Sequence, residues 1–256
     1  MEGPTSGPVV VLSYAFSGAP RIQRMLAAGA DLACTYGTGI MAQCANAAQE
    51  WRQQAGRDDS AWPQPEVPVS PEPIQAQVMR ILAGAGKSRW CELATGYAGA
   101  AEAFGRVFPD AAFVCVHRSC QDVIRAGTRV SPWVLQRQAL GPYLLSYGGN
   151  TVAALAAYWV HSAERLLAFE RANPHSARRI RYEDMTGGAT AALGAIRAWL
   201  RLDCASSGAA FPAWPEPAES AQSVTWSREL PVPSDLIPQP LRDRIAGLHA
   251  ELGYPS

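Results

Sequence analysis

Two short polar segments, each at the end of an apolar run, carry residue types that bind anions. The first is Ser17-Gly18, which follows the β-branched run Val9–Leu12 and precedes Pro20. The run predicts a buried parallel strand, and a proline suits the first position of a helix. A tight turn between them aims backbone N–H groups and the positive end of the helix dipole at one point, which favours phosphate or sulfate. The alternative is an ordinary strand-to-helix corner in which Gly18 supplies only backbone freedom.

The second segment is His117-Arg118, at the end of the apolar run that begins at Ala112. A guanidinium group binds phosphate through parallel hydrogen bonds, and a histidine accepts a proton near neutral pH. Glu92, at the end of a third apolar run, is another candidate general base. Each side chain also has a structural alternative: an ion-pair partner for Arg118, a hydrogen-bonded core residue for His117, and a structural carboxylate for Glu92.

Apolar runs that alternate with helical patterns must position these side chains. The predicted strands are Val9–Leu12, Asp31–Thr35, Arg89–Leu93, Ala112–His117 and Arg179–Tyr182. The predicted helices begin at Pro20 and after the cap Ser119, and span Gly39–Ala55, Ile74–Ala83, Tyr97–Val107, Thr151–Arg171, Thr190–Leu200 and Pro240–Leu252. This alternation predicts an α/β fold of three layers, with a central parallel sheet flanked by helices on both faces. Ligands of such sheets bind at the carboxyl ends of the strands, where we expect the three candidate groups.

Three stretches rich in proline or turn residues interrupt this pattern. Residues 60–73 are predicted to form a surface loop, because proline removes a hydrogen-bond donor and restricts the residue before it. Residues 128–150 are predicted to form a turn-rich, mobile segment over the site, and residues 205–238 an irregular tail before the closing helix. We expect the first two stretches to shape an acceptor pocket. We also expect a single domain over residues 1–256, since a chain of this length buries one full core.

The composition excludes several classes of protein. A formal net charge of zero argues against a partner made of nucleic acid. The sequence shows no leader-like segment and no apolar run of about 18 residues, so we expect a cytoplasmic protein without a membrane partner. The 6 cysteines form no C-x-x-C pair, which favours reduced core thiols and no metal. The charged fraction of 17% is below the typical value of about 25%, which suits a homodimer contact or an apolar acceptor cleft.

In order and spacing, these segments resemble the sulfotransferase superfamily whose donor is 3′-phosphoadenosine 5′-phosphosulfate (PAPS). Ser13-Tyr-Ala-Phe-Ser-Gly-Ala-Pro20 resembles the family's 5′-phosphosulfate loop, and residues 108–124 resemble its 3′-phosphate segment. Arg181-Tyr-Glu-Asp-Met185 matches the family's Tyr-Glu-Asp signature, and Trp90-Cys-Glu92 is similar to the Trp-x-Glu-Lys strand of many bacterial members. The resemblance covers residues 9–202 and implies a P-loop-like fold, PAPS as co-substrate, and chemistry that needs no metal.

The resemblance also implies roles for individual residues. Ser17 and Gly18 would hold the 5′ group of PAPS, and Ala19 and Arg21 are also expected to bind the cofactor. Arg118 would pair with the 3′-phosphate, and Tyr182 would lie near the adenosine. Glu92 or His117 would take the proton from the acceptor.

Five positions depart from the family's pattern. The usual residues are a Lys or Arg before the loop serine, two threonines after the loop glycine, a Lys after the strand glutamate, and a Ser in the 3′-phosphate pocket. In their places this chain has Phe16, Ala19-Pro20, Leu93 and Ala126. A cation near the bridging oxygen stabilises the charge on the departing nucleotide, and Phe16 cannot do this. The candidates for a replacement are Arg21, Arg24, Lys87 and His117.

Three hypotheses about function follow. The first is a transferase that moves a sulfuryl group from PAPS to a hydroxyl or amine of a small-molecule acceptor of the kind found in secondary metabolism. The second is a divergent protein with a sulfotransferase fold that has lost PAPS chemistry and catalyses another reaction. The third is a protein of this fold that only binds. A rise of melting temperature with 3′,5′-adenosine bisphosphate would show that the donor pocket survives, whereas no shift would favour the second or third hypothesis. Binding without product from any acceptor would support the third.

Overall fold

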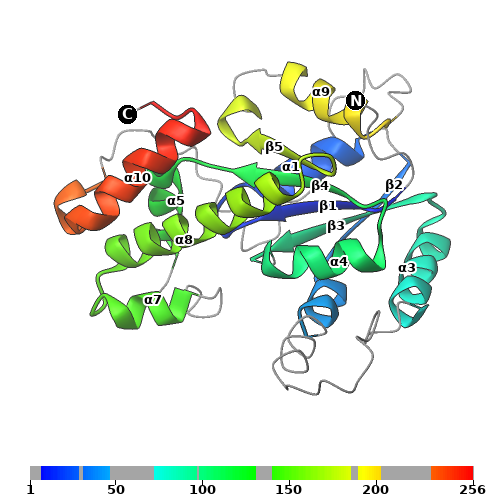
Figure 1. Ribbon diagram of the computed structural model, residues 1–256, viewed down its shortest axis with the longest axis horizontal. Coiled ribbons are helices and arrows are strands. Elements are labelled where there is room, and N and C mark those ends of the chain that lie inside the picture. The colour runs from blue at the N-terminus through cyan, green and yellow to red at the C-terminus, as the bar shows by residue number, and fades with distance from the viewer. Residues whose placement is uncertain are drawn as a thin grey trace, which may run out of the picture. The chain divides into compact units, whose positions relative to one another are not determined.

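Five parallel strands form the central sheet of the computed structural model (Figure 1). They are β1 (Val9–Ser13), β2 (Leu32–Tyr36), β3 (Arg89–Thr95), β4 (Ala112–His117) and β5 (Ala177–Arg181), in the spatial order β2-β3-β1-β4-β5. Every residue of β1 and β4 is buried, as expected for strands covered on both faces. The structure describes residues 7–28, 31–46, 72–96, 98–130, 140–185, 190–202 and 232–255.

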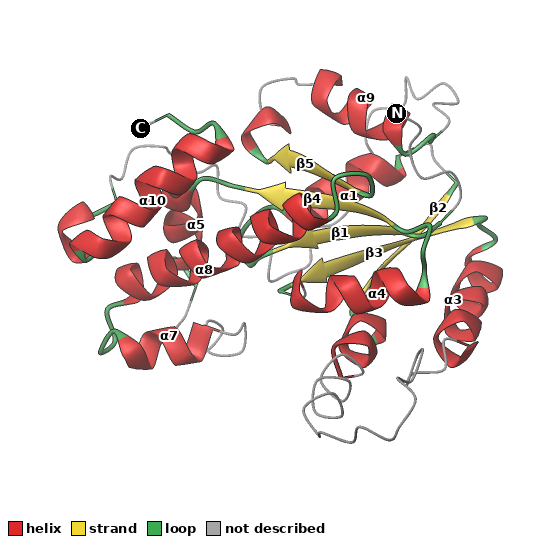
Figure 2. Ribbon diagram, in the orientation of Figure 1, coloured by secondary structure: helices red, strands yellow, loops and turns green. Residues whose placement is uncertain are grey.

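Helices cover both faces of this sheet (Figure 2). On one face, α1 (Ala19–Ala27) and α9 (Thr190–Trp199) pack against alternate strand residues. This core cluster includes Val9, Val11, Cys91, Leu93, Val114, Ile22, Leu26 and Ile196. On the other face, Phe104 of α4 (Ala101–Val107) and Phe169 of α8 (Thr151–Ala172) lie 6.1 and 4.9 Å from Phe113 of β4, between ring centres. The predicted α/β fold, with a parallel sheet between two helical layers, is confirmed.

By their contacts, the residues fall into two compact units. The first, Met1–Arg118 with His161–Asp203, contains the whole sheet with α1, α3 (Glu72–Ala85), α4 and α9. The second, Ser119–Val160 with Cys204–Ser256, contains α5 (Cys120–Gly127), α7 (Gly141–Ser146) and α10 (Gln239–Leu252). Within the second unit, His249 accepts a hydrogen bond from the Cys120 amide at 3.2 Å and lies 5.3 Å from Trp159, between ring centres. A single domain over residues 1–256 stays a prediction.

Four helices begin one residue before a proline, which shifts several predicted boundaries. The pairs are Ala19-Pro20, Glu72-Pro73, Gly141-Pro142 and Gln239-Pro240. As a result, α3 takes in the last two residues of the loop predicted at 60–73, and the rest of that loop lies outside the described residues. The turn-rich segment predicted at 128–150 contains a helix, α7. A proline in the second helical position costs no hydrogen bond, because the N–H groups of the first turn have no partner within the helix.

The other strand and helix boundaries lie within a few residues of those predicted from the sequence. Strand β4 has the predicted bounds, whereas β3 runs two residues further, to Thr95. The helix predicted from Gly39 begins at Ile40 and is described to residue 46. Of the tail predicted at 205–238, the described part contains a 3₁₀ turn at Ser234–Leu236.

Candidate functional site

The turn between β1 and α1 has the backbone geometry of an anion cradle. Gly18 is the N-cap of α1 and has a left-handed backbone, with φ of 80° and ψ of 13°. A Cβ atom at this position would lie 2.2 Å from the Tyr182 ring, so only glycine fits. Phe16 also has a positive φ, 66°, which is rare for a bulky residue and marks a constrained backbone. The turn therefore fixes the direction of the Ala19 N–H at the carboxyl end of β1, whereas Pro20 has no N–H and the Arg21 N–H donates to the Gly18 carbonyl at 3.1 Å.

Ser17 adds a buried polar atom to this turn. Its side chain is 1% exposed, and its Oγ has no hydrogen-bond partner among the described residues. Its backbone N–H donates to the Tyr14 carbonyl at 3.2 Å, which closes the turn. A buried hydroxyl without a partner costs about 1–3 kcal/mol, and an anion in the turn would remove that cost. The position therefore fits a phosphate or sulfate group.

Arg118 reaches the same turn from the end of β4. Its Nη1 donates to the Phe16 carbonyl at 3.0 Å, and its guanidinium carbon lies 4.4 Å from the centre of the Tyr182 ring. The guanidinium carbon of Arg21, in the first turn of α1, lies 6.0 Å from the same ring. Ala19 belongs to this site through its backbone, because its side chain is buried in the core. The structure thus brings together the six predicted donor-binding residues: Ser17, Gly18, Ala19, Arg21, Arg118 and Tyr182.

Tyr14 positions the backbone of Arg118, a role that sequence reasoning missed. Its hydroxyl accepts a hydrogen bond from the Arg118 N–H at 2.8 Å and donates one to the Arg118 carbonyl at 2.9 Å. Its ring is buried and lies edge-on to His117, with ring centres 6.1 Å apart. The sequence does contain one indication of this role: Tyr14 directly follows a buried strand, and a buried tyrosine hydroxyl needs a hydrogen-bond partner. The sequence alone does not show that the partner is 104 residues away.

His117 belongs to a buried charge network. Its Nε2 hydrogen-bonds Glu170 Oε1 at 2.7 Å, and Arg179 Nη2 pairs with Glu170 Oε2 at 2.6 Å. Burial acts to raise the pKa of the Glu170 carboxyl, but the hydrogen bonds and charges of His117 and Arg179 outweigh it and lower that pKa. His117 is fully buried, and its Nδ1 has no hydrogen-bond partner among the described residues. One ring nitrogen is therefore oriented by a carboxylate, while the other has no partner in the described structure.

Glu92 lies in the middle of β3 and not at its end as predicted, because β3 continues to Thr95. The side chain is buried, and its Oε1 accepts hydrogen bonds from the Thr38 hydroxyl at 2.9 Å and the Thr38 N–H at 3.3 Å. Its Oε2 accepts a hydrogen bond from the Thr35 hydroxyl. Thr35 accepts one in turn from the Trp90 indole N–H at 2.7 Å. Both carboxylate oxygens of Glu92 are therefore already used. Its role as a general base stays a prediction.

The distance between Glu92 and His117 prevents them from acting on the same proton. The strand register pairs Glu92 with Val10 of β1, and Val10 with Phe113 of β4. His117 follows Phe113 by four residues, about 13 Å along the strand, and β3 lies two strands from β4, about 10 Å away. The two backbones are therefore about 16 Å apart. The two side chains are alternatives as a general base.

Of the candidates for the missing cation, Arg21 is the one with a contact at the Tyr182 ring. Lys87 precedes β3, at the amino end of the sheet, and pairs at 3.7 Å with the aspartate before β2. Leu93 packs in the apolar core cluster, so its position could not present a cation to the cradle. The Arg24 Nε donates at 3.2 Å to the backbone carbonyl one turn back in α1.

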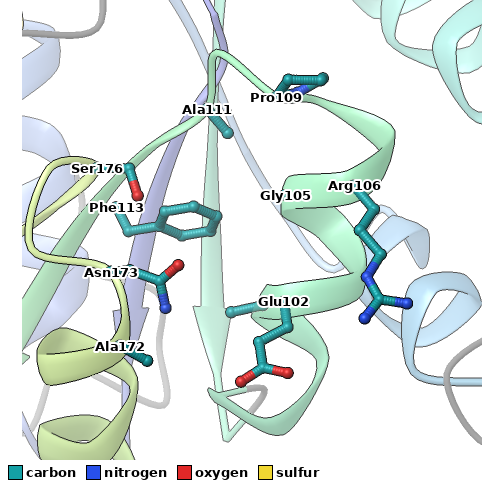
Figure 3. Close-up of a pocket in the computed structure, with 10 residues that line it drawn as sticks. Glu102, Gly105, Arg106, Pro109, Ala111, Phe113, Ala172, Asn173 and Ser176 are labelled. Carbon is teal, nitrogen blue, oxygen red and sulfur yellow. The ribbon is translucent and has the colours of Figure 1, made fainter.

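A separate groove of about 410 Å³ lies at the amino end of β4 (Figure 3). Its lining includes Glu102 and Arg106 of α4, Phe113 of β4, and Asn173 and Ser176 between α8 and β5. Because ligands of parallel sheets bind at the carboxyl ends of the strands, this groove is not part of the candidate site.

Neither a metal centre nor a membrane helix is found in the parts of the chain that the structure describes. No group of three or more His, Cys, Asp and Glu side chains there could hold a metal ion. None of the helices there combines the length and the apolar character needed to cross a membrane. The expectations of metal-free chemistry and of a cytoplasmic location stay predictions.

A comparison with protein families relates residues 8–206 to the family described as "Sulfotransferase family". None of the curated proteins matches this sequence. Several solved structures are similar over almost the whole chain.

The first of these structures is the sulfotransferase domain from the curacin biosynthetic pathway, 17% identical, with a TM-score of 0.55 over 97% of this chain and 98% of that one. The sulfotransferase domain of the Synechococcus olefin synthase is 14% identical, with a TM-score of 0.59 over 100% and 97%. A sulfotransferase from Alicyclobacillus acidocaldarius is 13% identical, with a TM-score of 0.54 over 98% and 97%. At these identities the likeness shows a shared P-loop-like α/β fold.

Proposed function

Since this chain belongs to the sulfotransferase family, whose profile matches most of its length, we propose that it transfers a sulfuryl group from PAPS to a hydroxyl or amine of a small molecule. The observation that carries the proposal is the convergence of three anion-binding features at one end of the sheet. These are the buried Ser17 hydroxyl, the N-terminus of α1 at Gly18, and the Arg118 guanidinium. A nucleotide with phosphate groups at both its 3′ and 5′ positions matches such a set.

Each residue of the cradle then has a definite task toward the donor. PAPS supplies an activated sulfuryl group and a nucleotide leaving group. Ser17 and the Ala19 N–H at the start of α1 hold its 5′ end, and Arg118 holds its 3′-phosphate. Tyr182 packs beside the adenosine, and Arg21 takes the place of the missing loop lysine because it lies in the first turn of α1.

His117 is the better supported of the two candidate bases. It directly precedes Arg118 at the carboxyl end of β4, and Glu170 orients its ring through Nε2. A carboxylate that binds one ring nitrogen leaves the other to accept the acceptor's proton. Glu92, in contrast, lies mid-strand with both oxygens hydrogen-bonded.

Substitutions at these two positions separate the base from a structural residue. We expect His117→Asn to lower kcat about 100-fold while the dissociation constant of 3′,5′-adenosine bisphosphate changes little, because the base is lost and the donor-binding groups remain. The variant also loses the hydrogen bond from His117 to Glu170, and its melting temperature reports that effect separately. The matched variant Glu92→Gln keeps its shape and should retain most of kcat. The measurement is steady-state turnover of an acceptor pool with PAPS, together with nucleotide affinity. If only Glu92→Gln lowers kcat, Glu92 is the base and the assignment to His117 is wrong.

Binding of the desulfated nucleotide tests the proposed function itself. Saturation with 3′,5′-adenosine bisphosphate at about 100 times its dissociation constant should stabilise the fold by about 2.7 kcal/mol. For a chain of this size, that corresponds to a rise in melting temperature of about 5–10 °C. Adenosine 5′-monophosphate, which lacks the 3′-phosphate, is the matched control and should raise the melting temperature less. If the bisphosphate at millimolar concentration gives no shift, the donor is not PAPS.

A further inference from the structure

Two cysteines face each other at one edge of the sheet. Cys34 of the edge strand β2 is the register partner of Cys91 on the adjoining parallel strand β3. Side chains of register partners point to the same face of a sheet, from backbones about 4.8 Å apart. Disulfides join Cα atoms that lie about 4.4–6.8 Å apart. The backbone spacing of this pair is therefore within the range that disulfides span, and both cysteines are free thiols in this structure.

The two thiols differ in environment, which gives them different chemical tasks. Cys34 is exposed, whereas Cys91 is fully buried and accepts a weak hydrogen bond from Gln23 Nε2 at 3.9 Å. The neighbouring Cys91 thiol lowers the pKa of Cys34, because it acts as a hydrogen-bond donor toward the Cys34 sulfur. That same hydrogen bond, together with burial, raises the pKa of Cys91 well above its ordinary value. The exposed sulfur is thus the better nucleophile of the pair.

We infer that Cys34 and Cys91 form a reversible redox pair that a hydroperoxide oxidises to an intramolecular disulfide. In the first step the Cys34 thiolate attacks a peroxide oxygen, the O–O bond breaks, and Cys34 becomes a sulfenic acid while the released hydroxide takes up a proton to leave as water. In the second step the Cys91 sulfur attacks the Cys34 sulfur, the S–O bond breaks, and a second water leaves. Two thiols have then lost two hydrogen atoms, and hydrogen peroxide has been reduced to two waters.

This inference goes beyond the proposed function and does not rest on it. It also changes the expectation that the cysteines are reduced core thiols, since Cys34 lies exposed on an edge strand. The disulfide would join β2 and β3 directly beside the hydrogen bond from Thr35 to Glu92. A dithiol reductant would restore both thiols by exchange.

Mass spectrometry of the oxidised full-length protein tests the inference. The protein is treated with hydrogen peroxide, remaining thiols are blocked with N-ethylmaleimide, and the intact mass and a non-reduced peptide map are recorded. We expect a loss of two hydrogen masses, one cross-linked peptide pair that contains Cys34 and Cys91, and full recovery of both thiols with dithiothreitol. A link from Cys34 to any other cysteine, or Cys34 found as sulfinic acid without a cross-link, would overturn the inference.

Three variants sharpen the test. Cys34→Ser should form no disulfide, and Cys91→Ala should let oxidation at Cys34 proceed to a gain of oxygen atoms, because the resolving thiol is gone. Cys44→Ser is the matched control: Cys44 is a buried thiol outside the two strands, and its loss should leave the disulfide unchanged. If Cys91→Ala still shows the loss of two hydrogens, Cys91 is not the partner. The peptide map of the native chain decides the question even if a variant does not fold.

Discussion

Replacing Arg118 with alanine is expected to weaken the binding of 3′,5′-adenosine bisphosphate about 1,000-fold. A guanidinium fork makes two charge-assisted hydrogen bonds to a phosphate, each worth about 2 kcal/mol, and alanine removes both. Arg118 is only half-buried at the end of β4, so the variant should keep its fold, with a far-ultraviolet spectrum like that of the native chain. Isothermal titration calorimetry of the native and variant proteins measures the difference.

Two further variants show whether the effect of Arg118 is specific. Lys87→Ala removes the same charge at the opposite end of the sheet, where Lys87 pairs with Asp31, and should leave the affinity nearly unchanged. Arg118→Lys keeps the charge but not the planar fork, and should recover only part of the lost affinity. If the native protein binds the nucleotide and Arg118→Ala binds it equally well, the assigned phosphate contact is wrong, although the family assignment is not affected.

The strands could be predicted from the sequence because each is an apolar run with polar residues at its ends. For β4, the run from Ala112 and the polar pair His117-Arg118 gave the bounds that the structure has. For β3 the same reasoning predicts an end at Leu93, because a charged residue such as Glu92 usually lies at the end of a buried strand, whereas the strand continues to Thr95. In the structure Thr35 and Thr38 hydrogen-bond this carboxylate, which allows a charged residue to lie in mid-strand. A sequence pattern does not show such partners, since they come from β2 and the segment after it.

Helix starts were less predictable, for one recurring reason. Pro20 and Pro240 were each expected to be the first residue of a helix, and each is the second. Pro73 and Pro142 were assigned to loops, and each is likewise the second residue of a helix. Proline is tolerated throughout the first turn, so its presence marks a helix start only to within a residue or two. Because Pro142 was counted among the turn residues of 128–150, α7 was not predicted.

The candidate donor-binding residues could be found from the sequence, but the residues that position them could not. Ser17, Gly18 and Arg118 each lie next to a recognisable strand or turn. Their supports come from far along the chain: the partner of the Tyr14 hydroxyl is 104 residues away, and Glu170 is 53 residues from His117. Only the fold creates these pairs, because helix and strand periodicity carry information about near neighbours alone.

Replacing Glu170 with glutamine is expected to lower the stability of the fold by an amount that depends on pH. The Glu170→Gln variant leaves the buried His117 and the neighbouring Arg179 without their carboxylate. Breaking a largely buried ion pair by removing one partner typically costs about 3 kcal/mol or more at neutral pH. For a chain of this size, the melting temperature should fall by about 6–12 °C. Differential scanning calorimetry of both proteins from pH 7 to pH 3 measures the effect.

The pH dependence follows from the pKa of the Glu170 carboxyl, which lies below its ordinary value of 4.5. Burial acts to raise this pKa, but His117 and Arg179 favour the charged carboxylate and lower it. A carboxyl whose pKa is lower in the folded state stabilises the fold above its unfolded pKa. It loses that contribution as the pH falls through the folded pKa. The stability difference between native protein and Glu170→Gln should therefore be full at pH 7 and shrink steadily below about pH 4.5.

Glu102→Gln, which removes an exposed carboxylate from α4, is the matched control and should parallel the native curve. A difference that stays constant down to pH 3 would mean that Glu170 acts through packing alone, and that its charge neither stabilises the fold nor orients the imidazole of His117.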